Sequence, residues 1–205
     1  MKDWTELANS ESIQKAINSL KANGINATVV ESGQEAKTKV FEIIPQNAEV
    51  MNMSSVTLDT LGISKEIQES GKYNSVKAKL MKMDRNTQGL EIQKLGSAPE
   101  YAVGSVHAVT EDGKLLIASN TGSQLSSYAY ASAHVIWVVG TQKIVKDMDE
   151  GMKRIYEYIL PLESARINKV FNITRGSNVS KMLIINKEIM PNRLTLIFVK
   201  EKLGF

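Results

Sequence analysis

The sequence predicts a single α/β domain, residues 1–205, built on a mostly parallel sheet with flanking helices and a β-hairpin. A strand, helix, strand succession near the N-terminus is typical of parallel strands joined by crossover helices. An Asp-Gly pair between two β-rich runs indicates the hairpin. The chain has 205 residues, 42% of them hydrophobic, so one domain can bury a sufficient core without disulfides or metal.

The N-terminal elements follow from hydrophobic spacing and from residues that end helices. Apolar residues within 13–20 recur at the helical spacing i, i+3, i+4 and i+7, and Asn23-Gly24 supplies a left-handed stop. Pro45 ends a second helix because proline cannot continue the backbone hydrogen-bond ladder. We therefore expect, after the first helix, a strand at 27–30, a helix at 34–44 and a strand at 48–53.

The middle of the chain combines a polar stretch with the hairpin. A short helix is expected after Met53, and residues 81–100 are polar and weakly periodic, which predicts mainly loop with room for one irregular helix. The hairpin joins strands at 106–109 and 115–118. Its turn contains Asp112-Gly113, a pair that tolerates positive φ.

The C-terminal part alternates buried strands with a long helix. Residues 135–139 form the longest apolar run, which has the length of a buried strand. Asp147 is the expected N-cap of a helix over 147–160 that Pro161 ends or kinks. Two further strands close the chain, at 182–185 and 194–199.

Composition excludes several classes of protein. The formal charge of +3 is small and Lys and Arg are evenly spread, which argues against a nucleic-acid partner and against membrane insertion. Without cysteine the chain offers no thiolate ligand for an iron–sulfur cluster or zinc, and its two histidines lack metal-ligand spacing. We expect no metal and no cofactor. The N-terminus lacks the apolar region of a signal peptide, so we expect a cytoplasmic protein.

The loop after strand 115–118 is the first candidate ligand site. It offers free backbone N–H groups, two hydroxyls and the positive end of a helix, which together suit a small anion such as a carboxylate or phosphate. The alternative is a capped helix start that needs no ligand. The candidate residues are Asn120, Thr121, Gly122, Ser123 and Gln124.

Two other loops follow strands and are expected at the same side of one sheet, where ligands of α/β proteins bind. In one, Lys143 is a candidate partner for a carboxylate or phosphate, the alternative being a solvated lysine at a turn. In the other, hydroxyls line the pocket or cap the next helix. The candidates are Gly140, Thr141, Gln142 and Lys143, and Ser54, Ser55 and Thr57.

Several stretches, in order along nearly the whole chain, resemble the lactate-utilisation (LUD) domain family. They are Gly104-Ser105-Val106-His107-Ala108-Val109-Thr110-Glu111-Asp112-Gly113, Thr121-Gly122-Ser123 and Val138-Val139-Gly140-Thr141-Gln142-Lys143, with Ser55-Val56-Thr57-Leu58 upstream. The resemblance implies a sheet related to the sugar-phosphate isomerase and CoA-transferase group. It also implies a link to lactate oxidation in multi-subunit systems whose other subunits carry iron–sulfur clusters, and it adds Gly104 to the candidate ligand-binding residues.

The sequence thus supports two functions. The first is an accessory or small-anion-binding component of lactate or related organic-acid utilisation. The second is a stand-alone isomerase or CoA-transferase-like enzyme acting on a phosphorylated or CoA-linked substrate. Since CoA-transferase relatives use a glutamate nucleophile, the resemblance makes Glu111 the candidate catalytic residue. Whether any reaction is catalysed, and whether the chain forms a homo-oligomer, stays open at this point, as does a purely structural role.

Overall fold

The computed structural model describes residues 2–205. The helices are α1 (Ser10–Ala22), α2 (Gly33–Ile43), α3 (Val56–Thr60), α4 (Ile63–Glu69), α5 (Val76–Leu80), α6 (Gly89–Ser97), α7 (Met148–Lys153) and α8 (Leu160–Phe171). The strands are β1 (Asn26–Val30), β2 (Glu49–Asn52), β3 (Asn74–Ser75), β4 (Tyr101–Gly104), β5 (Ala108–Thr110), β6 (Leu115–Ser119), β7 (His134–Gly140), β8 (Ile144–Val145), β9 (Lys181–Ile185) and β10 (Leu194–Val199).

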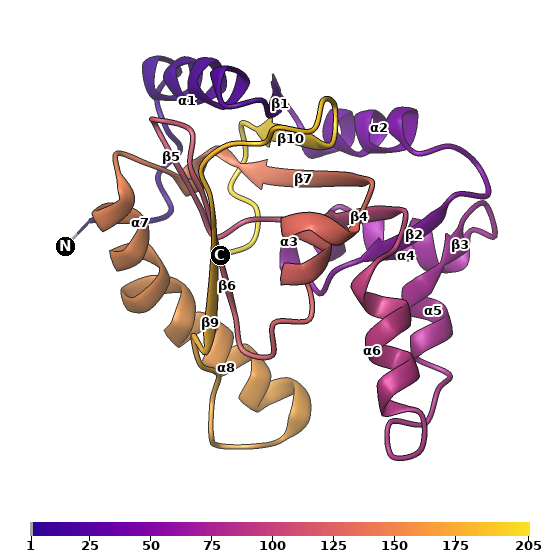
Figure 1. The fold of residues 1–205 in the computed structure, drawn as a ribbon. Coiled ribbons are helices and arrows are strands. Elements are labelled where there is room, and N and C mark those ends of the chain that lie inside the picture. Colours follow the sequence, from indigo (N-terminus) through magenta and orange to yellow (C-terminus); the bar gives the residue numbers. More distant parts are fainter. Residues whose placement is uncertain (1) are drawn as a thin grey trace.

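The main sheet has six parallel strands in the order β1-β10-β7-β4-β2-β3. The last strand in sequence, β10, lies between β1 and β7 (Figure 1). This arrangement confirms the predicted α/β fold with a mostly parallel sheet. Because parallel strands end at one edge, the loops after β2, β4 and β7 are brought near one another.

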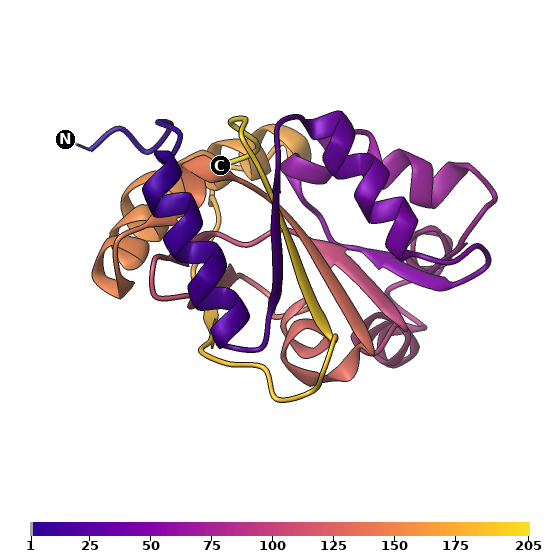
Figure 2. The same cartoon turned by 90° about the horizontal axis from the view of Figure 1, so that it is seen from above.

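Alternate residues of β7 face opposite sides of this sheet, as the two-residue period of a strand requires. Val135, Trp137 and Val139 pack into the same core cluster as the apolar face of α1. Ile136 and Val138 belong to a second cluster, formed with α2 and α4. Figure 2 shows the result: α1 and α2 lie on opposite sides of the edge strand β1.

The hairpin belongs to a second, four-stranded sheet in the order β8-β5-β6-β9. Its turn is closed by the Gly113 N–H, which donates to the Thr110 carbonyl at 2.9 Å, and Gly113 has φ +81°. Glycine is needed there because only a residue without Cβ adopts this φ freely. The expectation that the loop after 115–118 leaves the same sheet as the other two is therefore wrong, since β6 pairs antiparallel with β5 and β9.

A single long helical segment covers the outer face of the second sheet (Figure 1). It consists of α7, a π-helical stretch over Arg154–Ile159 and α8. Asp147 is the N-cap, as predicted, and its carboxylate accepts from the Glu150 N–H. Pro161 was predicted to end or kink the helix, and it does not end it. The wider π turn directly before the proline accommodates its ring and its missing N–H, so the helix continues to Phe171.

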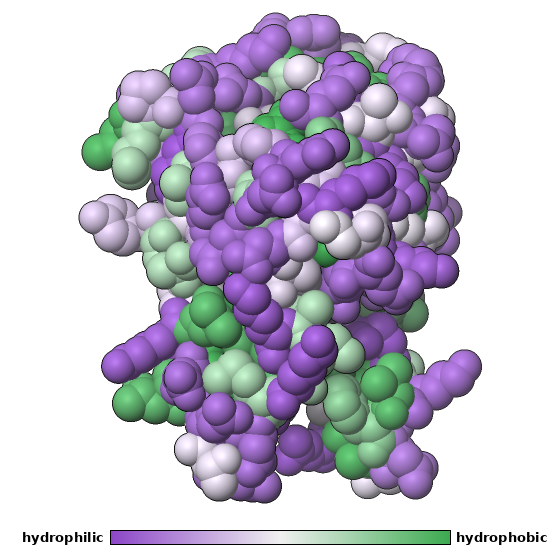
Figure 3. Space-filling model, turned by 90° about the vertical axis from the view of Figure 1, so that its right-hand side faces the viewer, coloured by the Kyte–Doolittle hydropathy of each residue, from purple (hydrophilic) through white to green (hydrophobic). Residues whose placement is uncertain are grey.

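The remaining surface is ordinary for a folded domain. Residues 81–100 contain the regular helix α6, which forms with α5 a lobe on the side of the molecule opposite α8 (Figure 1). That side is mainly hydrophilic, with apolar patches toward its lower end (Figure 3). None of the helices within residues 2–205 combines the length and apolar character that crossing a membrane requires.

Candidate functional site

A cavity of about 580 Å³ lies where the loops after β2, β4, β6 and β7 meet the long helix. This volume is in the range of small-molecule sites. Although β6 leaves the other sheet, its loop reaches the same cavity as the loops from the parallel strands. The cavity brings together these predicted site residues: Ser54, Ser55, Thr57, Asn120, Thr121, Ser123, Gln124 and Lys143.

Five predicted ligand-binding residues do not line the cavity, and several have structural roles. A Cβ on Gly104 would lie 1.7 Å from the hydroxyl oxygen of Tyr128, so glycine there makes room for this buried ring. A Cβ on Gly140 would lie 2.6 Å from the Glu201 carbonyl oxygen. The Gln142 Nε2 donates to the Leu203 carbonyl at 2.9 Å, which fixes the C-terminal segment. The other two are Gly122 and Thr141.

The backbone of the loop 120–124 is largely occupied by its own hydrogen bonds. The Gly122 N–H donates to Ser119 Oγ at 2.8 Å, and the Ser123 N–H donates to Thr121 Oγ1 at 3.3 Å. Two of the amides that were expected to cradle an anion, those of Gly122 and Ser123, are therefore already bonded. What this loop contributes to the cavity wall is the hydroxyl groups of Thr121 and Ser123 and the Gln124 side chain.

Lys143 is the most unusual side chain of the cavity. It sits in a short 3-10 turn between β7 and β8 and is only 4% exposed, so it is not the solvated lysine of the alternative interpretation. Its Nζ lies 3.2 Å from Ser105 Oγ, 3.3 Å from the Val106 carbonyl oxygen and 3.4 Å from Thr57 Oγ1. No carboxylate is among these contacts. Burial, and then the nearby charge of Arg154, lower the pKa of Lys143 to about 7.

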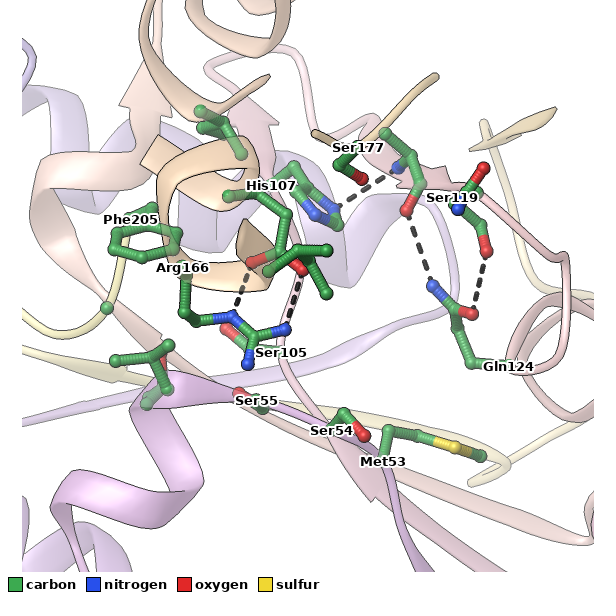
Figure 4. A pocket seen from close by; sticks show the side chains of 18 of the residues that line it. Met53, Ser54, Ser55, Ser105, His107, Ser119, Gln124, Arg166, Ser177 and Phe205 are labelled. Atoms are coloured by element: carbon green, nitrogen blue, oxygen red, sulfur yellow. Dashed lines mark hydrogen bonds and ion pairs between the residues drawn. The ribbon is translucent and has the colours of Figure 1, made fainter. Parts of the chain in front are cut away.

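His107 lies beside Lys143 on the cavity wall and was not predicted as a site residue. Its Nδ1 accepts the Ala118 N–H at 3.2 Å (Figure 4). Burial, followed by the charges of Lys143 and Arg154, lowers the pKa of His107 to about 3, so the ring is neutral. A neutral imidazole whose Nδ1 accepts must carry its proton on Nε2. His107 can therefore donate one hydrogen bond to a ligand.

Arg154 stands behind His107 in the π-helical stretch and is fully buried. Its Nη1 donates to the His107 carbonyl at 2.8 Å, whereas Nε and Nη2 have no hydrogen-bond partner within residues 2–205. Its guanidinium lies 5.3 Å from the ring centre of Tyr158. Burial lowers the pKa of Arg154 to about 10, which still leaves it charged at neutral pH. This buried cation gives the cavity wall a positive potential.

Further charged and hydroxyl groups line the same cavity. The Lys77 Nζ donates to Ser54 Oγ at 2.8 Å, and burial lowers the pKa of Lys77. Arg166 forms two hydrogen bonds with Glu163, at 2.6 and 2.7 Å, and points toward the cavity (Figure 4). The cavity is thus lined by the cations Lys77, Lys143 and Arg166 and by several hydroxyl groups, a combination that suits a small anion.

Glu111 lies elsewhere, at the hairpin turn. Its carboxylate accepts from Ser12 Oγ at 2.8 Å and pairs with Lys15 at 2.7 Å. These two interactions lower the pKa of Glu111. Because the carboxylate is outside the cavity and engaged in an ion pair, the structure does not present it to a molecule bound there. Within residues 2–205, no three acidic or histidine side chains cluster as metal ligands would.

The family model of the LUD domain matches residues 13–199. The chain belongs to the LUD domain family. Among solved structures, this LUD domain is similar to a DUF162 family protein from Deinococcus radiodurans, with a TM-score of 0.56 at 12% identity, covering 95% of this chain and 99% of that one. This likeness concerns the fold. No curated protein matches the chain.

Two further solved structures share parts of the arrangement at lower similarity. Ribose 5-phosphate isomerase from Plasmodium falciparum has a TM-score of 0.40 at 10% identity, covering 84% of this LUD domain and 95% of the isomerase. The eIF2B beta protein from Chaetomium thermophilum has a TM-score of 0.30 at 13% identity, covering 68% and 43% respectively. Matches at these scores carry no functional argument.

Proposed function

We propose that this LUD domain binds a small organic carboxylate in the cavity and serves as an accessory component of lactate or related organic-acid utilisation. The observation that carries the proposal is Lys143, a buried lysine without a carboxylate partner, on the wall of a ligand-sized cavity. A buried charge that the protein leaves unpaired costs stability, and an incoming anion would offset that cost.

Neighbouring groups support the same ligand class. The Nε2–H of His107 is a free donor, and the hydroxyls of Ser105 and Thr57 surround the lysine amine. A hydroxy acid or an oxo acid presents a carboxylate and one further oxygen, which matches the Lys143 cation together with the neutral donors His107 and Ser105. The link to lactate rests on family membership, and the expected partners are iron–sulfur subunits, since this chain supplies no thiolate.

The stand-alone isomerase or CoA-transferase is less well supported. It needs a carboxylate nucleophile or base beside the ligand, and Glu111 is held by Lys15 outside the cavity. We therefore favour binding over catalysis by Glu111.

Isothermal titration calorimetry with lactate and pyruvate tests the proposal. At least one acid should bind, and Lys143→Met should weaken its binding by about 1.5 to 3 kcal/mol, the usual worth of a hydrogen bond to a charged group. Lys65→Met is the matched control because Lys65 is exposed on α4, and it should leave the affinity unchanged. Equal affinity of the Lys143→Met and wild-type proteins would contradict the proposed site.

A further inference from the structure

We propose that Lys143 is a nucleophile that condenses with the carbonyl group of a 2-oxo acid in the cavity, forming an imine at Nζ. This inference rests on the proposed binding of an organic carboxylate and narrows the ligand class to acids that carry a carbonyl next to the carboxylate.

The surroundings of Nζ separate Lys143 from the other lysines. Side chains such as Lys15, Lys72 and Lys200 each hold a carboxylate oxygen within 2.8 Å, which keeps them protonated. Lys143 contacts two hydroxyls and one carbonyl oxygen, all at 3.2 Å or more. Of the acids on the cavity wall, Glu163 is engaged by Arg166. Asp59 also lines the cavity, but within residues 2–205 no carboxylate lies within hydrogen-bond distance of Lys143 Nζ.

The contacts of Nζ fit an amine as well as an ammonium. The Thr57 hydroxyl donates to the Leu203 carbonyl at 3.2 Å, so Thr57 Oγ1 is an acceptor toward Lys143. The Val106 carbonyl oxygen is also an acceptor. These two acceptors match the two N–H bonds of a neutral amine and leave its lone pair for a ligand, whereas an ammonium donates its third N–H to Ser105 Oγ. A pKa of about 7 makes this neutral form abundant at neutral pH.

The reaction balances without an oxidant or a reductant. The Nζ lone pair forms a bond to the carbonyl carbon, and the proton lost by nitrogen goes to the carbonyl oxygen, giving a carbinolamine. Loss of that hydroxyl together with the remaining proton on nitrogen, as water, leaves the C=N bond. The Ser105 hydroxyl, 3.2 Å from Nζ, is placed to relay the proton, and the His107 Nε2–H can hold an oxygen of the acid.

Reductive trapping tests the imine on the unmodified protein. Wild-type protein is incubated near neutral pH with pyruvate, glyoxylate or 2-oxoglutarate and sodium cyanoborohydride, and peptide mapping by mass spectrometry locates the adduct. We expect one adduct per chain, on Lys143, with at least one of the three acids. Lys77, on the same cavity wall, is the internal control and should stay unmodified. Lactate has a hydroxyl group in place of the ketone or aldehyde carbonyl that an amine attacks, so it should give no adduct.

Lys143→Arg keeps a cation at this position but cannot form the imine, so its adduct should be lost. Because a buried substitution can disturb folding, the site of the adduct in the wild-type protein remains the decisive measurement. Calorimetry with the same acids separates the two proposals. Binding without an adduct at Lys143, or adducts spread evenly over surface lysines, overturns the imine and leaves the binding function. Neither binding nor an adduct overturns both.

Discussion

Replacing Lys143 by methionine should change how the stability of the protein depends on pH. In the unfolded chain this lysine has its ordinary pKa of 10.5, whereas in the fold the pKa is about 7. Between these values the unfolded state binds more protons than the folded state, so the stability of the wild-type protein rises with pH. Below about pH 7 both states are protonated and the full cost of burying the charge is present.

The magnitude follows from the size of the pKa change. At about 1.4 kcal/mol per pKa unit, the drop from 10.5 to about 7 corresponds to roughly 5 kcal/mol of lost stability in acidic solution. Methionine has a similar length and no charge, so Lys143→Met removes this cost. When the pH is raised from about 7 to about 9, the free energy of unfolding of the wild type should therefore increase by about 2 kcal/mol relative to that of the variant.

Urea denaturation of both proteins at several pH values measures this difference. Other titrating groups are common to both proteins and largely cancel. Of the charged groups near Lys143, Arg154 keeps its charge in this range and burial keeps the His107 ring neutral. The carboxyl groups of Asp59 and Glu163, which line the same cavity, are common to both proteins. Lys65→Met, on the surface of α4, should run parallel to the wild type. Parallel profiles for Lys143→Met as well would show that the buried lysine keeps its proton, contrary to our reasoning.

Three further changes test other parts of the structure. Gly104→Ala should lower the free energy of unfolding by about 1 to 3 kcal/mol, because its methyl group crowds the Tyr128 hydroxyl. Adding Tyr128→Phe to the same chain should restore part of the lost stability. If the two substitutions instead give additive losses in urea denaturation, this clash is excluded. Arg193→Met should lower the free energy of unfolding by about 3 to 5 kcal/mol, because it leaves Glu188 and three backbone carbonyls without their buried partner. A loss of stability under about 1 kcal/mol would refute this role of Arg193. Glu111→Gln should leave pyruvate and lactate binding unchanged in calorimetry, and a large loss of affinity would return Glu111 to the site.

Elements with a clear local pattern could be predicted from the sequence. The helix at 13–20 and the strand at 135–139 are specified by the spacing of their own apolar residues, and the hairpin by Asp112-Gly113. The partition into two sheets could not be predicted, because it depends on β6 pairing with β9, some 60 residues later in the chain. That the helix continues past Pro161 could not be predicted, because the π turn before the proline has no signal in the sequence.

For the candidate site, too, some residues could be predicted from the sequence and others could not. The hydroxyl loops and Lys143 could be predicted because they follow strands whose ends meet at one edge. The burial of Lys143 could not, because it depends on the long helix and on the C-terminal segment that packs over it. The burial of Arg154 could not be predicted either, because Arg154 lies between the polar Lys153 and the apolar Ile155 in an otherwise amphipathic helix. His107 was placed within a strand, whereas β5 begins one residue later.

The π-helical stretch Arg154–Ile159 fixes the rotational phase of everything that follows it. An α-helix turns by about 100° per residue and a π-helix by less, so the same six residues wound as regular α-helix would rotate α8 about its own axis by roughly the turn of one residue, about 100°. Glu163 and Arg166 would then turn away from the cavity, although their sequence and their mutual ion pair would be intact. The orientation of this wall therefore depends on the one extra residue that the π turn holds, and related chains with regular α-helix here should be one residue shorter in this stretch.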